Sequence, residues 1–131
     1  MSYQSQLAEL KSIIEKIEYY KYTTNSLIYW DKITYMPKNA VYLLEKNGFA
    51  LDDLTYFIGH QANMRIMSNI AKQLNLPEEK FLHNIEELGN TGSVSSALVY
   101  AQNDHTFKKG DLVCLTVFGG GYSAGACLIQ C

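Results

Sequence analysis

The feature that most constrains the fold is an alternation of strand-like and helix-like segments from residue 54 onward. In residues 63–74, methionine, isoleucine and leucine recur at the spacing of one helix face, whereas short apolar runs indicate strands. The predicted order is strand 54–59, helix 63–74, strand 81–88, helix 93–103, strand 111–118 and strand 123–131. Such alternation favours an α/β layer. A short glycine-rich turn joins the last two strands, which are therefore expected to be antiparallel neighbours.

The amino-terminal part of the chain has a different pattern, which predicts helices. Leucine and isoleucine recur every three or four positions in residues 4–30, and tyrosines then become frequent. Because proline lacks a backbone N–H, Pro37 is expected to interrupt the helical stretch. A short helix over 39–47 is expected to end at Gly48. The composition changes at this proline, so we predict two parts: an amino-terminal helical segment, 1–38, and an α/β domain, 39–131.

Charge and hydropathy exclude two classes of partner. The formal net charge is −2 and no basic stripe is visible, so we expect no nucleic-acid partner. No apolar run approaches the ~20 residues that cross a bilayer. The amino terminus also lacks the pattern of a secretory signal. We therefore expect no membrane association.

Cysteine and histidine usage favours a cytoplasmic protein without a metal. Three cysteines close to the carboxyl terminus are a poor basis for a disulfide framework, and a reducing cytoplasm is the simplest setting. The histidines stand far apart and form no HExxH pair, so neither a metal nor another cofactor is expected. These residues are Cys114, Cys127 and Cys131, and His60, His83 and His105.

Three short motifs in the second part occur in an order that one enzyme family shares. They are HQANMRI at 60–66, GNTGSVSS at 89–96 and FGGGYSAG at 118–125. Together, residues 39–131 resemble the carboxyl-terminal part of β-ketoacyl-[acyl carrier protein] synthase III, a condensing enzyme of the thiolase fold. The resemblance implies a partial thiolase-like half with the order β-α-β-α-β-β.

A second resemblance concerns the first part of the chain. The stretches LIYWD at 27–31 and TYMP at 34–37 are similar to the amino-terminal helices of the carboxypeptidase Taq family of metallopeptidases. That family's chemistry depends on a zinc-binding HExxH helix, which this chain lacks. The first part therefore implies a helical relic or a graft, and the chain is a candidate chimera, natural or engineered.

The synthase resemblance assigns hydrogen-bond donors to three positions. In that family a cysteine holds an acyl group, and the enolate formed from malonyl carrier protein attacks it. His60 and Asn90 match the two donors that stabilise the enolate oxygen. The backbone N–H of Gly120 would contribute to an oxyanion hole. The alternative readings are a strand-end residue for His60, a turn residue for Asn90 and an ordinary hairpin turn at Gly120.

The same resemblance assigns binding roles to two residues after His60. Asn63 would lie near the pantetheine arm of the substrate. Arg65 would face the acidic carrier protein, because a guanidinium pairs well with carboxylates. A solvated helix face explains both residues equally simply.

The nucleophile is missing from this pattern. A reactive cysteine needs a lowered pKa, often at a helix amino terminus, and no cysteine of this chain precedes a predicted helix. In the family the reactive cysteine belongs to the amino-terminal half, which has no counterpart here. We therefore expect a fragment that needs a complementing synthase half, with acyl-CoA and acyl carrier protein as its partners. The alternative is a non-catalytic module, with an exposed sheet edge that favours homo-oligomers.

Overall fold

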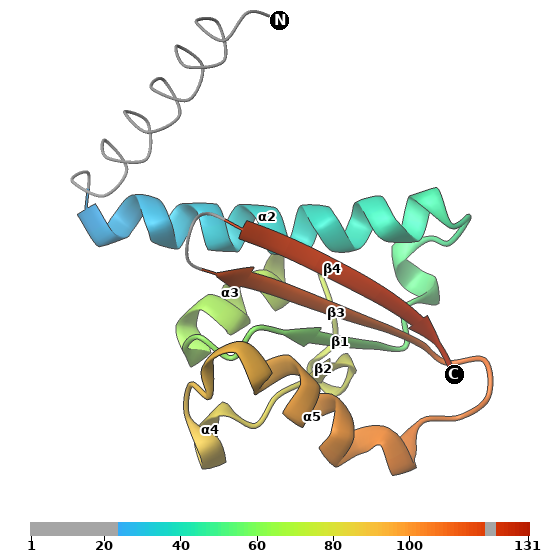
Figure 1. Cartoon of the computed structure of the whole chain (residues 1–131). Helices are drawn as coiled ribbons and strands as arrows, with labels where there is room; N and C mark the ends of the chain where they lie inside the picture. Colours follow the sequence, from blue (N-terminus) through green and yellow to red (C-terminus); the bar gives the residue numbers. More distant parts are fainter. Residues whose placement is uncertain (1–23, 120–122) are drawn as a thin grey trace, which may run out of the picture. The chain divides into compact units, whose positions relative to one another are not determined.

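A computed structural model describes residues 24–119 and 123–131 of the chain (Figure 1). Residues Lys32–Cys131 form one compact unit. Most of the helix predicted over 4–30 lies outside the described residues. Within the described residues, no helix combines the length and the apolar character that a membrane span requires.

The compact unit is built on a four-stranded mixed sheet with the order β2-β1-β3-β4. The central strand β1 pairs in parallel with both β2 and β3, whereas β3 and β4 are antiparallel. The strands are β1 Tyr56–Gly59, β2 Phe81–Leu82, β3 Leu112–Gly119 and β4 Ser123–Gln130. The predicted antiparallel hairpin at the carboxyl end is confirmed, since Leu112 pairs with Gln130 and Gly119 with Ser123.

Helices connect the parallel strands, because such strands require crossover connections. Helix α3, Met64–Gln73, joins β1 to β2, and helices α4, Ile85–Leu88, and α5, Ser95–Asn103, lie between β2 and β3. The α3 side chains that recur at helical spacing are buried, as predicted. The predicted helix at 93–103 is confirmed except that residues 92–94 form a single 3-10 turn.

The predicted strand at 81–88 is wrong beyond its first two residues. Only Phe81–Leu82 pair with β1, and the chain then turns into α4. The backbone N–H of Asn84 donates to the Gln61 side chain rather than to a neighbouring strand. Tertiary contact thus ends the strand, and residues 85–88 become a single helical turn.

The interruption predicted at Pro37 is also wrong. Helix α2, Thr24–Lys46, runs through this proline without a break. A proline inside a helix costs about 3 kcal/mol. Met36 and Leu44 are almost fully buried, and burying each such side chain contributes about 1.5–3 kcal/mol, which is enough to offset that cost. The helix ends as predicted at Gly48, whose φ of 79° suits glycine. The domain boundary between 38 and 39 stays a prediction.

The two faces of the sheet are covered by different helices. On one face, Ile58 of β1 and Val113 of β3 are fully buried in a cluster with Val99 of α5. On the other face, the ring of Phe57 stacks on Phe81, with centroids 5.3 Å apart. Helix α2 packs close to this second face at Gly59, because a Cβ at that position would lie 3.1 Å from the Met36 methyl carbon.

The buried face of α2 is expected to stabilise the compact unit. Leu44 is 1% exposed, so Leu44→Ala should lower the free energy of unfolding by about 2–5 kcal/mol. The neighbouring Glu45 is exposed, and Glu45→Ala should change it by less than about 0.5 kcal/mol. Urea denaturation of both variants measures the difference. Equal effects would show that α2 does not dock as described.

Candidate functional site

His60 follows the last residue of β1, at the carboxyl-terminal edge of the parallel strands. Its imidazole is half-buried, and its Nδ1 lies 2.8 Å from the Oγ of Ser95, the first residue of α5. The two residues are 35 positions apart in the sequence, so the sheet and the α5 crossover bring them together. The carboxyl edge of parallel strands is where ligands commonly bind in α/β folds.

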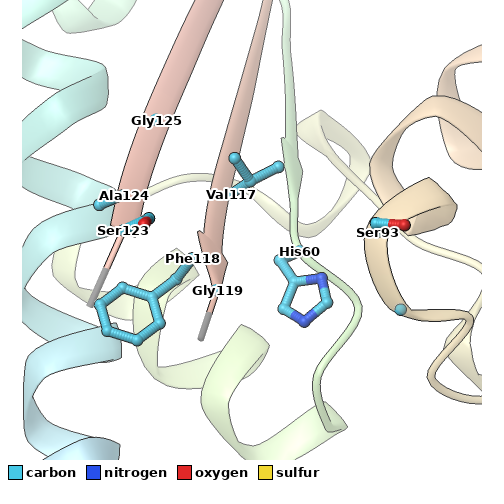
Figure 2. Close-up of a pocket in the computed structure, with 9 residues that line it drawn as sticks. His60, Ser93, Val117, Phe118, Gly119, Ser123, Ala124 and Gly125 are labelled. Atoms are coloured by element: carbon cyan, nitrogen blue, oxygen red, sulfur yellow. The ribbon is translucent and has the colours of Figure 1, made fainter. Parts of the chain in front are cut away.

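A cavity of about 580 Å³ opens beside His60 (Figure 2). All three sequence motifs contribute to its lining. The first motif contributes His60, the second contributes Gly92 and Ser93, and the third contributes residues at the end of β3 and the start of β4. In Figure 2, His60 lies between the β3–β4 hairpin and Ser93. The fold therefore brings together, around one hollow, segments that are separate in the sequence.

Gln61 holds the loops around this cavity together. Its side chain is fully buried, its Nε2 donates to the Gly59 carbonyl at 2.8 Å, and its Oε1 accepts the N–H of Asn84 at 3.1 Å. Its own backbone N–H donates to Ser95 Oγ at 3.3 Å. Sequence reasoning missed both Gln61 and Ser95. The signal for Gln61 was its place beside His60, but nothing in the sequence shows which serine of the second motif reaches that histidine.

The buried Gln61 amide is expected to be important for stability. Gln61→Leu keeps a similar volume but leaves the Gly59 carbonyl and the Asn84 N–H without their partner. Each lost partner costs about 1–3 kcal/mol, so the free energy of unfolding should fall by about 2–4 kcal/mol. Gln73→Leu, at an exposed position of α3, is the matched control and should shift it by about 0.5 kcal/mol or less. Thermal and urea unfolding provide the test, and a neutral Gln61→Leu would refute the bridging role.

The structure does not bring Asn90 into the cavity lining. This residue is exposed, and its Oδ1 accepts the N–H of Gly92 at 3.0 Å in a tight turn. A positive φ of 68° at Gly92 completes that turn. The geometry matches the turn reading that the sequence left open, and the role of Asn90 as a donor to an enolate stays a prediction.

The remaining predicted site residues lie on or near α3 or outside the described residues. Asn63 is exposed and caps α3, since its Oδ1 accepts the N–H of Ile66 at 2.9 Å. Arg65 is an exposed residue of the first turn of α3. Gly120 lies outside the described residues. The binding roles assigned to these positions stay predictions.

None of the cysteines lines the cavity, and Cys114 is buried in β3. Burial, followed by the charge of Cys127, raises the pKa of the Cys114 thiol to about 12. A thiol with so high a pKa is a poor nucleophile at neutral pH. Cys127 is exposed and Cys131 is half-buried. Within the described residues, no group of three or more His, Cys, Asp or Glu side chains is arranged to hold a metal ion.

The pKa of Cys114 predicts its reactivity. At pH 8 about one Cys114 thiol in ten thousand would be ionised, and the thiolate fraction should grow as the pH rises toward 12. Iodoacetamide at pH 8 should therefore modify Cys127 in the folded protein and Cys114 only after unfolding. Peptide mass spectrometry with and without denaturant measures both rates. Rapid modification of Cys114 in the folded chain would contradict the burial.

Residues 44–131 match the family model described as 3-Oxoacyl-[acyl-carrier-protein (ACP)] synthase III C terminal. The chain belongs to this family. β-Ketoacyl-[acyl-carrier-protein] synthase III of Acholeplasma laidlawii is 40% identical over 103 residues, which cover 79% of this chain and 33% of that protein. The synthase of Porphyromonas gingivalis is 33% identical over 112 residues, which cover 86% of this chain and 33% of the relative.

Solved structures of the family share the fold. The synthase III of Aquifex aeolicus superposes with a TM-score of 0.72 at 35% identity, over 76% of this chain and 33% of that one. The synthase III of Thermus thermophilus gives a TM-score of 0.78 at 28% identity, over 84% of this chain and 35% of that one. The predicted α/β, thiolase-like fold is therefore confirmed. The chain spans about a third of the length of the relatives that it matches.

The similarity to the synthases extends beyond the predicted domain boundary. The part of the chain aligned with the P. gingivalis synthase is 86% of 131 residues, which is longer than the 93 residues of 39–131. The alignment must therefore include residues before 39. The continuous helix α2, which spans this position, is consistent with that extension.

Proposed function

We propose that the chain supplies the carboxyl-terminal part of a β-ketoacyl-[acyl-carrier-protein] synthase III and condenses substrates only with a second chain that carries the nucleophilic cysteine. The observation that supports this proposal is the cavity formed by the three family motifs, with the His60 ring on its wall. The cysteines of this chain lie elsewhere, and Cys114 is held protonated by burial.

The reaction divides between the two chains. A cysteine thiolate of the complementing chain attacks an acyl-CoA thioester, and coenzyme A leaves as its thiolate. A malonyl thioester then loses carbon dioxide and becomes an enolate, whose carbon attacks the held acyl group and displaces the cysteine. The negative charge of the enolate lies mainly on oxygen. An N–H of His60, aimed at that oxygen, lowers the barrier without the ring having to ionise.

The partners follow from this chemistry. They are a complementing synthase chain, acyl-CoA and acyl carrier protein, in the cytoplasm. Arg65 is exposed on α3, where its guanidinium suits a carboxylate of the carrier protein. Asn63 is placed near the pantetheine arm, and Asn90 and the Gly120 N–H serve as further donors. For Asn90 this requires its turn to rearrange when the partner chain binds, because its Oδ1 accepts the Gly92 N–H.

Complementation tests the proposal. The chain alone should gain no acyl mass when incubated with acetyl-CoA. Mixed with the cysteine-bearing two thirds of the A. laidlawii synthase, it should catalyse release of carbon dioxide from malonyl carrier protein. His60→Ala in the mixture should lower kcat by about 10²–10³-fold, as for the loss of one oxyanion donor. Intact mass spectrometry and a coupled carbon dioxide assay measure the two results.

His105→Ala is the matched control, because this ring is exposed and away from the cavity. It should leave the activity of the mixture unchanged. A stoichiometric acyl adduct on the chain alone would overturn the need for a partner. Activity that survives in the His60→Ala mixture would overturn the role of this cavity.

A non-catalytic module is the second candidate function. It is supported by the buried and protonated Cys114 and by the Asn90 turn, which keeps Asn90 out of the described cavity lining. The composite origin suggested by the carboxypeptidase Taq resemblance is a further proposal. The resemblance of residues 27–37 to that family supports it, whereas the synthase alignment that extends before residue 39 opposes it.

A further inference from the structure

The tautomer of His60 decides what this residue can offer to a ligand. A neutral imidazole carries one proton, so one ring nitrogen donates a hydrogen bond and the other accepts one. Nδ1 lies 2.8 Å from Ser95 Oγ, and either group could be the donor of this bond. The hydrogen bonds around Ser95 determine its direction.

Ser95 has one hydroxyl proton and is 1% exposed, so bulk solvent does not reach it. The backbone N–H of Gln61 can only donate, so its bond to Ser95 Oγ at 3.3 Å uses a lone pair of the oxygen. Among the described residues, the one acceptor within hydrogen-bond distance of Oγ is His60 Nδ1. The Ser95 proton is therefore donated to Nδ1, and the ring proton belongs on Nε2.

The Gln61 amide fixes the position of the N–H that reaches Ser95. The Asn84 N–H is an obligatory donor, so the atom that it meets at 3.1 Å must be the amide oxygen of Gln61. The amide nitrogen then faces the Gly59 carbonyl, which can only accept, at 2.8 Å. In each of these Gln61 bonds, a group that can only donate meets an acceptor, or a group that can only accept meets a donor. The same amide thus holds the backbone on both sides of His60.

We propose that Ser95 is a positioning residue that holds His60 in the Nε2–H tautomer. In this form the ring can present an N–H donor to the cavity (Figure 2), which its side chain lines. The opposite tautomer would offer a lone pair, which repels a developing oxyanion. The catalytic meaning of this inference rests on the proposed function, since an enolate oxygen requires a donor. The tautomer itself is a property of this chain alone.

Nuclear magnetic resonance of the ¹⁵N-labelled chain tests the tautomer directly. At pH 8, above the usual histidine pKa of about 6.5, long-range ¹H–¹⁵N correlations distinguish a protonated from an unprotonated ring nitrogen. His60 is assigned by comparison with His83→Gln and His105→Gln. In the unsubstituted chain, we expect Nε2 to be protonated and Nδ1 to be an acceptor.

Ser95→Ala removes the donor to Nδ1 and should shift the His60 signals toward the other tautomer or a mixture of both. Ser95→Thr keeps a hydroxyl and should restore the original pattern. Ser96→Ala is the matched control on the same helix, because the buried Ser96 Oγ has no hydrogen-bond partner in the structure. It should leave the His60 signals unchanged.

A protonated Nδ1 in the unsubstituted chain would overturn the proposal, and this result does not depend on whether any variant folds. His60 signals that are the same in folded Ser95→Ala and in the unsubstituted chain would also overturn it. In the complemented enzyme, Ser95→Ala should lower kcat by up to about 100-fold with little change in KM. An Nε2–H tautomer without any condensation would support the tautomer assignment and refute the proposed function.

Discussion

The parallel pairing of β1 with strands on both of its sides is the constraint on which the rest of the structure depends. Its residues are buried on both faces of the sheet, with Phe57 against Phe81 and Ile58 against α5. Because β1 is central, the residues that follow it emerge between two neighbouring strands. This placement puts His60 at the cavity and Gln61 in the interior, where the Gln61 amide bonds to the end of β1 and to Asn84 of the β2–β3 crossover.

The buried polar groups near His60 fix the direction of its hydrogen bond more than they add to stability. A buried amide contributes little net free energy when it is satisfied, but it costs several kcal/mol when one partner is lost. The Gln61 side-chain amide is satisfied by backbone groups that can act in one sense only. Separately, the Gln61 backbone N–H donates to Ser95, which leaves the Ser95 hydroxyl proton for His60. In the proposed tautomer, this arrangement gives the neutral His60 ring a defined donor, its Nε2–H.

The sequence predicted local elements well where one face of an element is buried. The apolar spacing of α3 predicted its buried face, and the glycines after residue 118 predicted the antiparallel pairing of β3 with β4. It failed where tertiary contacts outweigh local preference. Pro37 stays inside α2 because buried neighbours offset its cost, and the strand at 81–88 ends after Leu82 because Gln61 binds the Asn84 backbone. Local sequence propensity takes no account of either tertiary contact, the packing of α2 or the bond from Asn84 to Gln61.

By itself, the sequence determined the α/β class, the family and the three motifs that carry it, because periodicity and motif order are local or sequential properties. The tertiary structure alone decided which residues of those motifs meet. It placed His60 against Ser95 and left Asn90 in a turn. From the sequence, each of His60 and Asn90 could have been either a donor at the site or a structural residue. The physical reason is distance along the chain. A bond between residues 35 positions apart depends on sheet register and crossover packing, which no short segment specifies.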